Sequence, residues 1–508
     1  MNIFFKVLIL IASTSVLQAQ YKFNKVFPSP ALPRYTVDAT STPLIELKDG
    51  CVLFVSRATA LDNSNYLYTY CTKLDPNGNV IWVKPITDSV DYVYARDFQK
   101  WGNDKYIICG SKYTSDKKYQ SYWYGLFDLN MELIESHLYP TSYNRPTFMK
   151  MLQSPNGDII FCGTNDQTDD RGNGASAYAK ASVMCVDSSG NQKWYHEFWD
   201  SIPSYELDNF LNLSFDSQGN TYACGKSFWV GNGGNNDDGI IAKFDGEGKV
   251  LWYKRYDELK DAQLFWYITE RKNEGMTLIG NSTSEQFTEP KYVRISFYRI
   301  DYDGNIKLIK NHPKTYQSGV RCFLELSDGN FVCGGFRQDS IEQKFADGGI
   351  YKFSRDGDII WSIRIDNSDY ESEYFSSISL SHDGGFFLGG QSWLPGIRAN
   401  RSWVVKTDSL GCDATSCIET GSNDAENETN QYKVYPNPAK DQVTIEILTN
   451  INMPSQIVFY NINGQEVLEQ NINTQKNIIN VKDLASGIYV YQIRDSKRNV
   501  FNGKMVIR

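Results

Sequence analysis

The sequence predicts an all-β fold in which one four-strand unit is repeated along the chain. Aromatic residues make up 14% of the 508 residues, with 33 tyrosines, and 38 glycines are spread through the chain. This composition favours strands joined by tight turns. Two turn motifs also recur at a nearly constant spacing, and the last repeat lacks a strand that is found near the N-terminus.

The first motif is a turn containing glycine, followed by a strand that often closes on Cys-Gly or Gly-Gly. Its copies are Asp49-Gly50, Gly102-Asn103, Asn156-Gly157, Gln218-Gly219, Glu274-Gly275, Asp328-Gly329 and Asp383-Gly384. Because glycine adopts the backbone angles of tight turns at little cost, each copy is interpreted as a hairpin turn.

The second motif is Asp, then Gly three positions later, then often Trp four positions after the glycine. Its complete copies begin at Asp75, Asp187 and Asp245, and its weaker copies begin at Asp128, Asp301, Ser354 and Asp408. Both motifs occur seven times with a period of roughly 52 to 62 residues. Four antiparallel strands per repeat, seven times, is typical of a seven-bladed β-propeller, which we expect over residues 20–417.

The seventh repeat predicts how the ring closes. It reaches Gly411, but no strand of the Trp type follows it. Residues 21–28 (YKFNKVFP) precede the first repeat at the distance where such a strand precedes the second. We therefore expect residues 21–28 to supply the outermost strand of the last blade and to protect sheet edges that would otherwise be open.

The N-terminus predicts a secretory signal peptide over residues 1–19. Lys6 precedes an apolar run, and the small residue Ala19 precedes Gln20. This pattern is too short for a membrane span, and no other stretch approaches the roughly 20 apolar residues that a span requires. Residues 418–431 are acidic, rich in Asn and nearly free of apolar side chains, so we expect a flexible linker.

Residues 432–508 predict a separate small β domain with strands of period two. Its motifs are Tyr435-Pro436-Asn437-Pro438, the Asn463-Gly464 hairpin turn, the Ser486-Gly487 turn followed by Tyr489, and Lys504. Together they resemble the type A C-terminal sorting domain that Bacteroidota use for type IX secretion. The resemblance implies a small Ig-like β-sandwich, recognition by the outer-membrane translocon and its shuttle protein through residues 432–508, and a location at the cell surface or in the medium.

The cysteines are interpreted as structural. Cys109, Cys162, Cys224 and Cys333 precede a glycine at what looks like one repeat position, so we expect small buried side chains. Cys412 and Cys417 lie close together at the end of the propeller. In an exported protein a local disulfide between them is favoured, although pairing is not readable from sequence alone.

Catalytic, metal and cofactor signatures are missing from the sequence. The four histidines form no metal-type pair, and there is neither a nucleophile elbow nor a glycine-rich phosphate loop. The turns at Asp75 and Asp301 resemble the start of a calcium loop, but the glycine falls at position four instead of six, which hairpin turns explain better. The acidic stretch at 235–238 is the stronger calcium candidate.

The net charge of −9 argues against a nucleic-acid partner. We expect the long polar segments Asn165–Ala179 and Gly231–Gly239 to be loops on one face of the propeller, where a glycan or protein ligand would bind. The favoured function is therefore a non-catalytic binding or adhesion module. The alternatives are a secreted hydrolase of polysaccharide or peptide with carboxylates at the channel mouth, and a structural spacer.

Overall fold

The computed structural model describes residues 22–27, 35–38, 43–60, 67–86, 92–113, 120–141, 145–168, 176–198, 206–231, 234–256, 262–283, 293–312, 317–339, 343, 345–367, 372–393, 400–413, 432–447, 455–461, 465–494 and 500–507. Within these residues all regular structure is β-strand, which confirms the all-β prediction. The predicted signal peptide and linker lie outside the described residues. The chain divides into two compact units, Met1–Ala414 and Thr415–Arg508.

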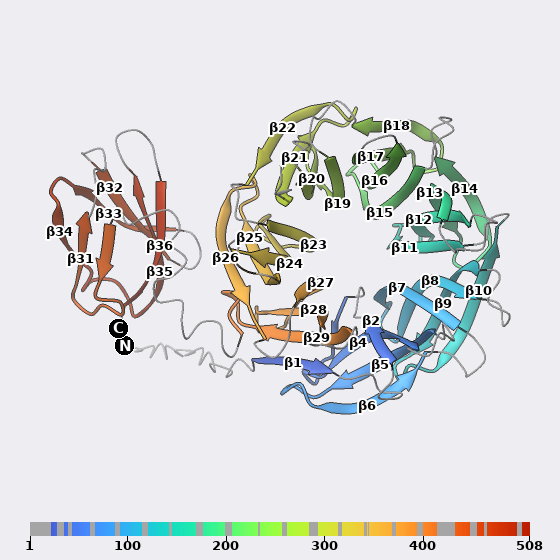
Figure 1. The fold of residues 1–508 in the computed structure, drawn as a ribbon, viewed down its shortest axis with the longest axis horizontal. Coiled ribbons are helices and arrows are strands. Elements are labelled where there is room, and N and C mark those ends of the chain that lie inside the picture. The colour runs from blue at the N-terminus through green and yellow to red at the C-terminus, as the bar shows by residue number, and fades with distance from the viewer. Residues whose placement is uncertain are drawn as a thin grey trace, which may run out of the picture. The chain divides into compact units, whose positions relative to one another are not determined.

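The first unit contains strands β1 to β29, which form radial sheets arranged in a ring (Figure 1). The first half of the unit comprises β1 (Phe23–Phe27), β2 (Tyr35–Asp38), β3 (Ile45–Glu46), β4 (Val52–Ala60), β5 (Leu67–Leu74), β6 (Val80–Pro85), β7 (Tyr92–Trp101), β8 (Lys105–Tyr113), β9 (Gln120–Asp128), β10 (Leu133–Pro140), β11 (Arg145–Gln153), β12 (Ile159–Thr168), β13 (Ser176–Val186) and β14 (Gln192–Phe198). The second half comprises β15 (Glu206–Phe215), β16 (Thr221–Gly231), β17 (Gly234–Phe244), β18 (Val250–Tyr256), β19 (Ala262–Arg271), β20 (Gly275–Thr283), β21 (Val293–Ile300), β22 (Ile306–Asn311), β23 (Gln317–Glu325), β24 (Phe331–Gln338), β25 (Asp347–Phe353), β26 (Ile359–Ile365), β27 (Glu373–Leu380), β28 (Phe386–Trp393) and β29 (Asn400–Thr407).

Each sheet is an antiparallel meander whose first strand lies nearest the axis and whose last strand lies at the rim (Figure 1). The meanders are β2/β3-β4-β5-β6, β7 to β10, β11 to β14, β15 to β18, β19 to β22, β23 to β26, and β27 to β29 with β1. One parallel pair, Ala179 with Leu207, joins β11–β14 to β15–β18 into an eight-stranded sheet. This radial arrangement is a β-propeller.

The first described strand completes the last sheet of the ring. Strand β1 pairs antiparallel with β29, from Phe23 opposite Lys406 to Phe27 opposite Ser402. The Nζ of Lys22 lies 2.5 Å from the carboxylate of Asp408, which adds an ion pair to the backbone ladder. This is the pairing that the sequence predicts for residues 21–28.

One carboxylate organises six of the seven turns of the second motif, and the hydroxyl of Ser354 takes its place in the other. In the first copy, the Oδ1 of Asp75 accepts hydrogen bonds from the backbone N–H groups of Asn77 at 2.9 Å and Asn79 at 2.8 Å. The same pattern recurs at Asp128, Asp187, Asp245, Asp301 and Asp408, and also at Asp216 of the first motif. Because backbone donors occupy the carboxylate, turn formation explains the spacing without calcium.

In four sheets, an aromatic residue of the outer strand packs on the turn glycine of the next sheet. A Cβ atom at Gly248, for example, would lie 2.3 Å from the indole of Trp194. The pairs are Trp194 with Gly248, Trp252 with Gly304, Trp361 with Gly411, and Phe23 with Gly78. Phe23 thus takes the place of the missing tryptophan, so a contact that joins several of the other sheets also closes the ring.

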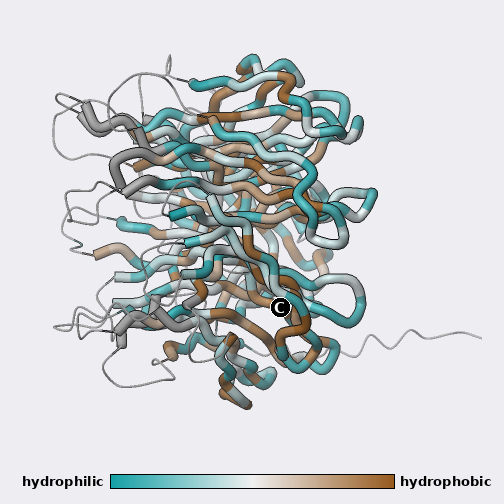
Figure 2. Tube along the Cα trace, turned by 90° about the vertical axis from the view of Figure 1, so that its right-hand side faces the viewer, coloured by the Kyte–Doolittle hydropathy of each residue, from teal (hydrophilic) through white to brown (hydrophobic). Residues whose placement is uncertain are grey.

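Buried side chains fill the spaces between neighbouring sheets. One cluster joins the first two meanders through residues such as Val55, Phe98 and Trp123, and another contains Phe23, Phe54 and Phe387 at the closure. Hydrophobic stretches lie along the strands between more polar ones, whereas the turns at one side of the ring are mostly hydrophilic (Figure 2). Packing between sheets, with no separate central core, therefore holds the propeller together.

The structure corrects two sequence interpretations. Residues 234–239, expected in a loop, belong to strand β17, which pairs with β16 out to Gly231 and Gly234. Both ends of the other expected loop are also strand, since residues 165–168 belong to β12 and residues 176–179 to β13. Two hairpin arms satisfy each other's backbone N–H and C=O groups, so the β17 arm extends without apolar side chains of its own, opposite Phe228, Trp229 and Val230 of β16. In addition, Cys109, Cys162 and Cys224 share one register, but Cys333 lies one residue earlier, because Gly334 pairs with Cys322.

The eight cysteines from Cys51 to Cys333 are buried and free. Cys412 is disulfide-bonded. Cys417, its predicted partner, lies outside the described residues, so the pairing stays a prediction.

The second unit consists of two sheets that share one core. Its strands are β30 (Tyr432–Tyr435), β31 (Gln442–Ile447), β32 (Ser455–Tyr460), β33 (Glu466–Ile472), β34 (Lys476–Asn480), β35 (Gly487–Arg494) and β36 (Val500–Ile507). The sheet orders are β30-β31-β34 and β33-β32-β35-β36. Val443 and Ile479 from the first sheet pack with Phe459 and Met505 from the second. In neither unit do the described residues include a helix with the length and apolar character of a membrane span.

Candidate ligand-binding site

Six innermost strands carry a β-bulge at the same position. In β7, Ala95 pairs with Gly110 and Asp97 pairs with Cys109, which leaves Arg96 without a cross-strand partner. A bulge redirects one side chain and is often found beside functional sites. The bulged residues are Arg96, Met149, Leu211, Trp266, Arg321 and Ser376, and all are partly exposed.

The bulge explains why the second strand of these sheets contains glycine. A Cβ atom at Gly110 would lie only 1.9 Å from the carbonyl oxygen of Tyr94, two residues before the bulged Arg96. The same clash, at 1.9 to 2.1 Å, occurs at Gly163, Gly225, Gly280, Gly335 and Gly390. Each of these glycines follows its bulged residue by 14 positions, as Gly110 follows Arg96. The Cys-Gly and Gly-Gly pairs in the sequence therefore mark bulges on the neighbouring strands.

Two bulged residues, Trp266 and Arg321, line a pocket of ≈ 190 Å³. It lies where β20 ends at Thr283 and β21 begins at Val293, so it opens on the side of the ring where second strands connect to third strands. Its lining also includes Asp237, Gln263, Asn281 and Phe336. Its volume is below the range of about 300–1,000 Å³ usual for drug-sized ligands, so it suits one small unit of a longer ligand.

Neighbouring groups position Arg321 at the wall of the pocket. The side-chain amide of Asn281 donates to the carbonyl of Val320 at 3.0 Å, and its oxygen accepts from the Val320 N–H at 2.9 Å. The Arg321 guanidinium lies 4.0 Å from the ring centroid of Tyr374, in a cation–π contact. Two fixed groups thus hold the backbone and the head of this arginine.

The pocket contains hydrogen-bond donors and one partly buried carboxylate, that of Asp237. Trp266 Nε1 is shielded from solvent and has no hydrogen-bond partner among the described residues. Burial raises the pKa of Asp237, and Lys226, with its Nζ 3.4 Å from the carboxylate, partly opposes this. An aromatic ring with amides, a guanidinium and a carboxylate can bind hydroxyl-rich ligands through stacking and directed hydrogen bonds.

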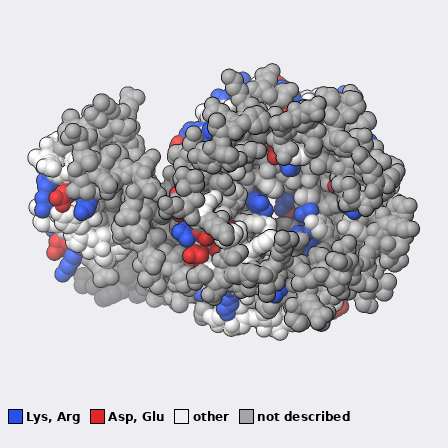
Figure 3. All heavy atoms as spheres, in the orientation of Figure 1, with Lys and Arg blue, Asp and Glu red and all other residues white. Residues whose placement is uncertain are grey.

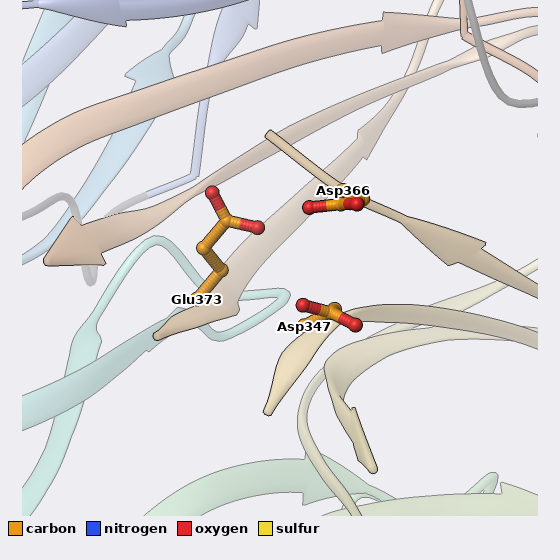
Figure 4. Close-up of side chains that lie close together, drawn as sticks. All are labelled: Asp347, Asp366 and Glu373. Carbon is orange, nitrogen blue, oxygen red and sulfur yellow. The ribbon is translucent and has the colours of Figure 1, made fainter. Parts of the chain in front are cut away.

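A second cluster joins the β23–β26 sheet to β27. Figure 4 shows the carboxylates of Asp347, Asp366 and Glu373 pointing toward one another, with one oxygen from each within 4.8 Å of the others. Carboxylate oxygens are the ligands that Ca²⁺ and Mg²⁺ prefer, so these residues could hold a divalent cation. However, the Nε of Arg364 lies 2.5 Å from the Asp347 carboxylate and its Nη2 lies 3.6 Å from that of Asp366, so an arginine already supplies positive charge.

Glu373 is buried at this junction, with 1% of its surface exposed. Burial raises its pKa to about 8, although its carboxylate accepts hydrogen bonds from the Asn367 N–H at 3.1 Å and the Ser392 hydroxyl at 3.0 Å. Burial also raises the pKa of Asp347 to about 6. Burial therefore favours the protonated form of Glu373.

In the second unit, two predicted sorting residues meet across the domain. The Nδ2 of Asn437 donates to the carbonyl of Lys504 at 3.0 Å, and its Oδ1 accepts from the N–H of Val506 at 2.9 Å. Asn437 stands between Pro436 and Pro438. The Pro-Asn-Pro motif thus ties the beginning of the domain to its last strand.

The remaining described sorting residues fix local structure. The hydroxyl of Tyr489 donates to the carbonyl of Ala485 at 2.7 Å, which spans the Ser486-Gly487 turn. The Tyr435 hydroxyl donates to the Glu446 carboxylate at 2.9 Å. Asn463 and Gly464 lie outside the described residues.

The sequence interpretation missed both clusters in the propeller. The bulged residues do have a signal, which is the fixed interval to the repeated glycine. The acidic cluster has none, because Asp347, Asp366 and Glu373 come from two sheets and no motif connects them.

Comparison with known proteins identifies the second unit. Residues 433–508 match the family model of a secretion system C-terminal sorting domain. The protein is therefore a propeller-bearing substrate of a secretion system, exported across the outer membrane to the cell surface or the extracellular space. No curated protein matches the chain.

Several solved structures resemble the propeller. A polysaccharide lyase of family PL25, an ulvan lyase, has a TM-score of 0.48 at 10% identity and covers 77% of this chain and 96% of its own. The polysaccharide lyase Uly1 has a TM-score of 0.43 at 9% identity, covering 72% and 89%. The β-propeller domain of the Trilobed protease from Pyrococcus furiosus has a TM-score of 0.40 at 10% identity, covering 76% and 98%. Such distant likenesses say nothing of this protein's ligand.

Proposed function

We propose that this protein is an exported, non-catalytic binding protein whose propeller binds a glycan at the pocket around Trp266 and Arg321. The observation that carries the proposal is the pocket itself. It combines an indole whose N–H lacks a partner among the described residues with amide, guanidinium and carboxylate groups. Sugars bind to such sites by stacking on the aromatic ring while their hydroxyls exchange hydrogen bonds with the polar groups.

The proposal includes the finer organisation of the chain. We count seven blades by treating the eight-stranded sheet as two, since a single residue pair joins its halves. Residues 1–19 are a signal peptide, 20–417 the propeller with a Cys412–Cys417 disulfide, 418–431 a linker, and 432–508 an Ig-like sandwich. The translocon and its shuttle protein engage this last domain, for which the match to the sorting-domain family is the support.

Glycan binding can be tested on the purified chain. An array of neutral and acidic glycans identifies a ligand, and calorimetry compares the wild type with Trp266→Ala. Loss of stacking typically costs about 1–3 kcal/mol, so we expect binding about tenfold weaker or worse. The matched control is Trp393→Ala, because Trp393 is 39% exposed and does not line the pocket. If no glycan binds, or if both variants bind like the wild type, the proposal is wrong.

A second candidate function, a hydrolase of polysaccharide or peptide, rests on the protonated Glu373. A carboxyl that keeps its proton at neutral pH suits a general acid, and Asp347 and Asp366 lie beside it. Polysaccharide and peptide hydrolysis by the wild type, abolished in Glu373→Gln, would support this function. A wild type inactive on both substrate classes would exclude it in favour of binding.

A further inference from the structure

Two arginines share one tyrosine ring near the propeller axis. Arg57 from β4 places its guanidinium carbon 4.0 Å from the ring centroid of Tyr94 in β7. The bulged Arg96 places its own guanidinium carbon 4.3 Å from the same centroid. Since arginine stays protonated throughout the physiological range, two positive charges meet at this ring.

The charge of Arg57 is poorly compensated. Only 7% of this residue is exposed. Its Nη1 is shielded from solvent and has no hydrogen-bond partner among the described residues, none of which forms an ion pair with its guanidinium. A buried cation with an unused donor is unfavourable unless an anion accepts from it.

Part of this arrangement, one arginine over one tyrosine ring, recurs elsewhere in the propeller. Arg321 lies over Tyr374 as Arg57 lies over Tyr94, and both tyrosines stand two residues before a bulged residue. Figure 3 shows Lys and Arg side chains around the hollow at the centre of the ring. This positive concentration contrasts with the net charge of −9 for the whole chain.

We propose that an oxyanion, the carboxylate or sulfate ester group of an acidic polysaccharide, binds to Arg57 and Arg96 at Tyr94. The planar guanidinium donates two parallel hydrogen bonds to such groups, which gives both strength and orientation. The polysaccharide part of this inference rests on the proposed function, whereas the oxyanion site stands on the contacts of Arg57.

The test is calorimetric titration of the purified chain with sodium sulfate, sodium acetate, dextran sulfate, polygalacturonate and neutral dextran. We expect the wild type to bind the small anions and the two acidic polymers, with neutral dextran inert at this site. Arg57→Gln removes a hydrogen bond from a charged group, so its affinity for the anions should be about tenfold lower or worse. Arg96→Gln is the second variant, and Arg57→Lys should rescue only part of the binding because it keeps the charge without the planar fork.

The controls separate this inference from its alternatives. Arg355→Gln, on the turn side with a 55% exposed side chain, should bind anions like the wild type. Asp38 pairs with Arg57 in the backbone register of β2 and β4, so Asp38→Asn tests whether a carboxylate of the chain neutralises this arginine. Anion binding by Asp38→Asn but not by the wild type would overturn the inference, as would unchanged binding in well-folded Arg57→Gln.

Failure of this inference can be distinguished from failure of the proposed function. Trp266→Ala should lose neutral glycans but retain sulfate, whereas Arg57→Gln should lose sulfate but retain neutral glycans. Sulfate binding without binding of either acidic polymer would overturn the polysaccharide assignment.

Discussion

The turn side of the propeller repeats both its backbone and its side chains, whereas the axis repeats only its backbone. At the turns, the same aspartate accepts the same two backbone hydrogen bonds in copy after copy, as at Asp75 and Asp187. At the axis the backbone also repeats, with a bulge in six innermost strands, but the bulged residue changes from Arg to Met, Leu, Trp and Ser. A uniform scaffold thus presents a varied set of side chains, and this variation is where binding specificity can reside.

The largest expected effect is a loss of stability when Phe23, at the rim of the propeller, is truncated. Phe23 is 4% exposed, packs with Phe387 and Phe54, and lies against Gly78. Truncation of a buried phenylalanine costs about 3–5 kcal/mol, so Phe23→Ala should lower the free energy of unfolding by that amount, as measured in urea. Leu133→Ala, at a rim residue with 46% exposure, should change stability little. Equal stability of Phe23→Ala and the wild type would mean that β1 does not close the ring.

Alanine substitutions at a glycine beside a bulge and at a glycine in a turn compare the axis with the turns. In Gly110→Ala the new Cβ meets a backbone carbonyl, which cannot move away as a side chain can. We expect a loss of about 1–3 kcal/mol or more, as for overpacked cores. Gly157 has a φ of +90° with no heavy atom within 4 Å of the added Cβ, so Gly157→Ala should cost about 1–2 kcal/mol from backbone strain alone. A smaller loss at Gly110 than at Gly157, by urea unfolding, would refute the bulge explanation.

A third difference concerns pH and the junction at Glu373. Its pKa of about 8 in the folded protein exceeds its ordinary value of 4.5, because burial disfavours the charged form. The folded state therefore binds the proton more tightly than the unfolded state, and this group's contribution to stability falls as the pH rises from about 4.5 to about 8. Glu373→Gln mimics the neutral acid, so above pH 8 it should melt at a higher temperature than the wild type.

Below pH 4.5 the melting temperatures of wild type and Glu373→Gln should converge, since both side chains are then neutral. The matched control is Glu132→Gln at the rim, where the carboxylate is 70% exposed. A Glu373→Gln protein whose difference from the wild type is the same at every pH would contradict the raised pKa.

The sequence predicts what local chemistry determines. Asp and Gly in a tight turn carry their own hydrogen-bond pattern, so the turns, the repeat and the closing strand could be recognised without coordinates. The Cys-Gly pairs could also be recognised in the sequence, but the reason for them could not. A backbone carbonyl on the neighbouring strand occupies the space that a side chain at the glycine would need. Asp347, Asp366 and Glu373 had no local signal at all. The polar arm Gly234–Gly239 was misinterpreted because its pairing depends on a backbone partner rather than on its own composition.

The measurement that most directly tests the division between turns and axis is hydrogen–deuterium exchange on the purified chain with and without its bound glycan. We expect added protection in β19 and β23, the strands that carry Trp266 and Arg321, and unchanged exchange in the turns around Asp75 and Asp187. Protection confined to those turns, with β19 and β23 unaffected, would contradict the account.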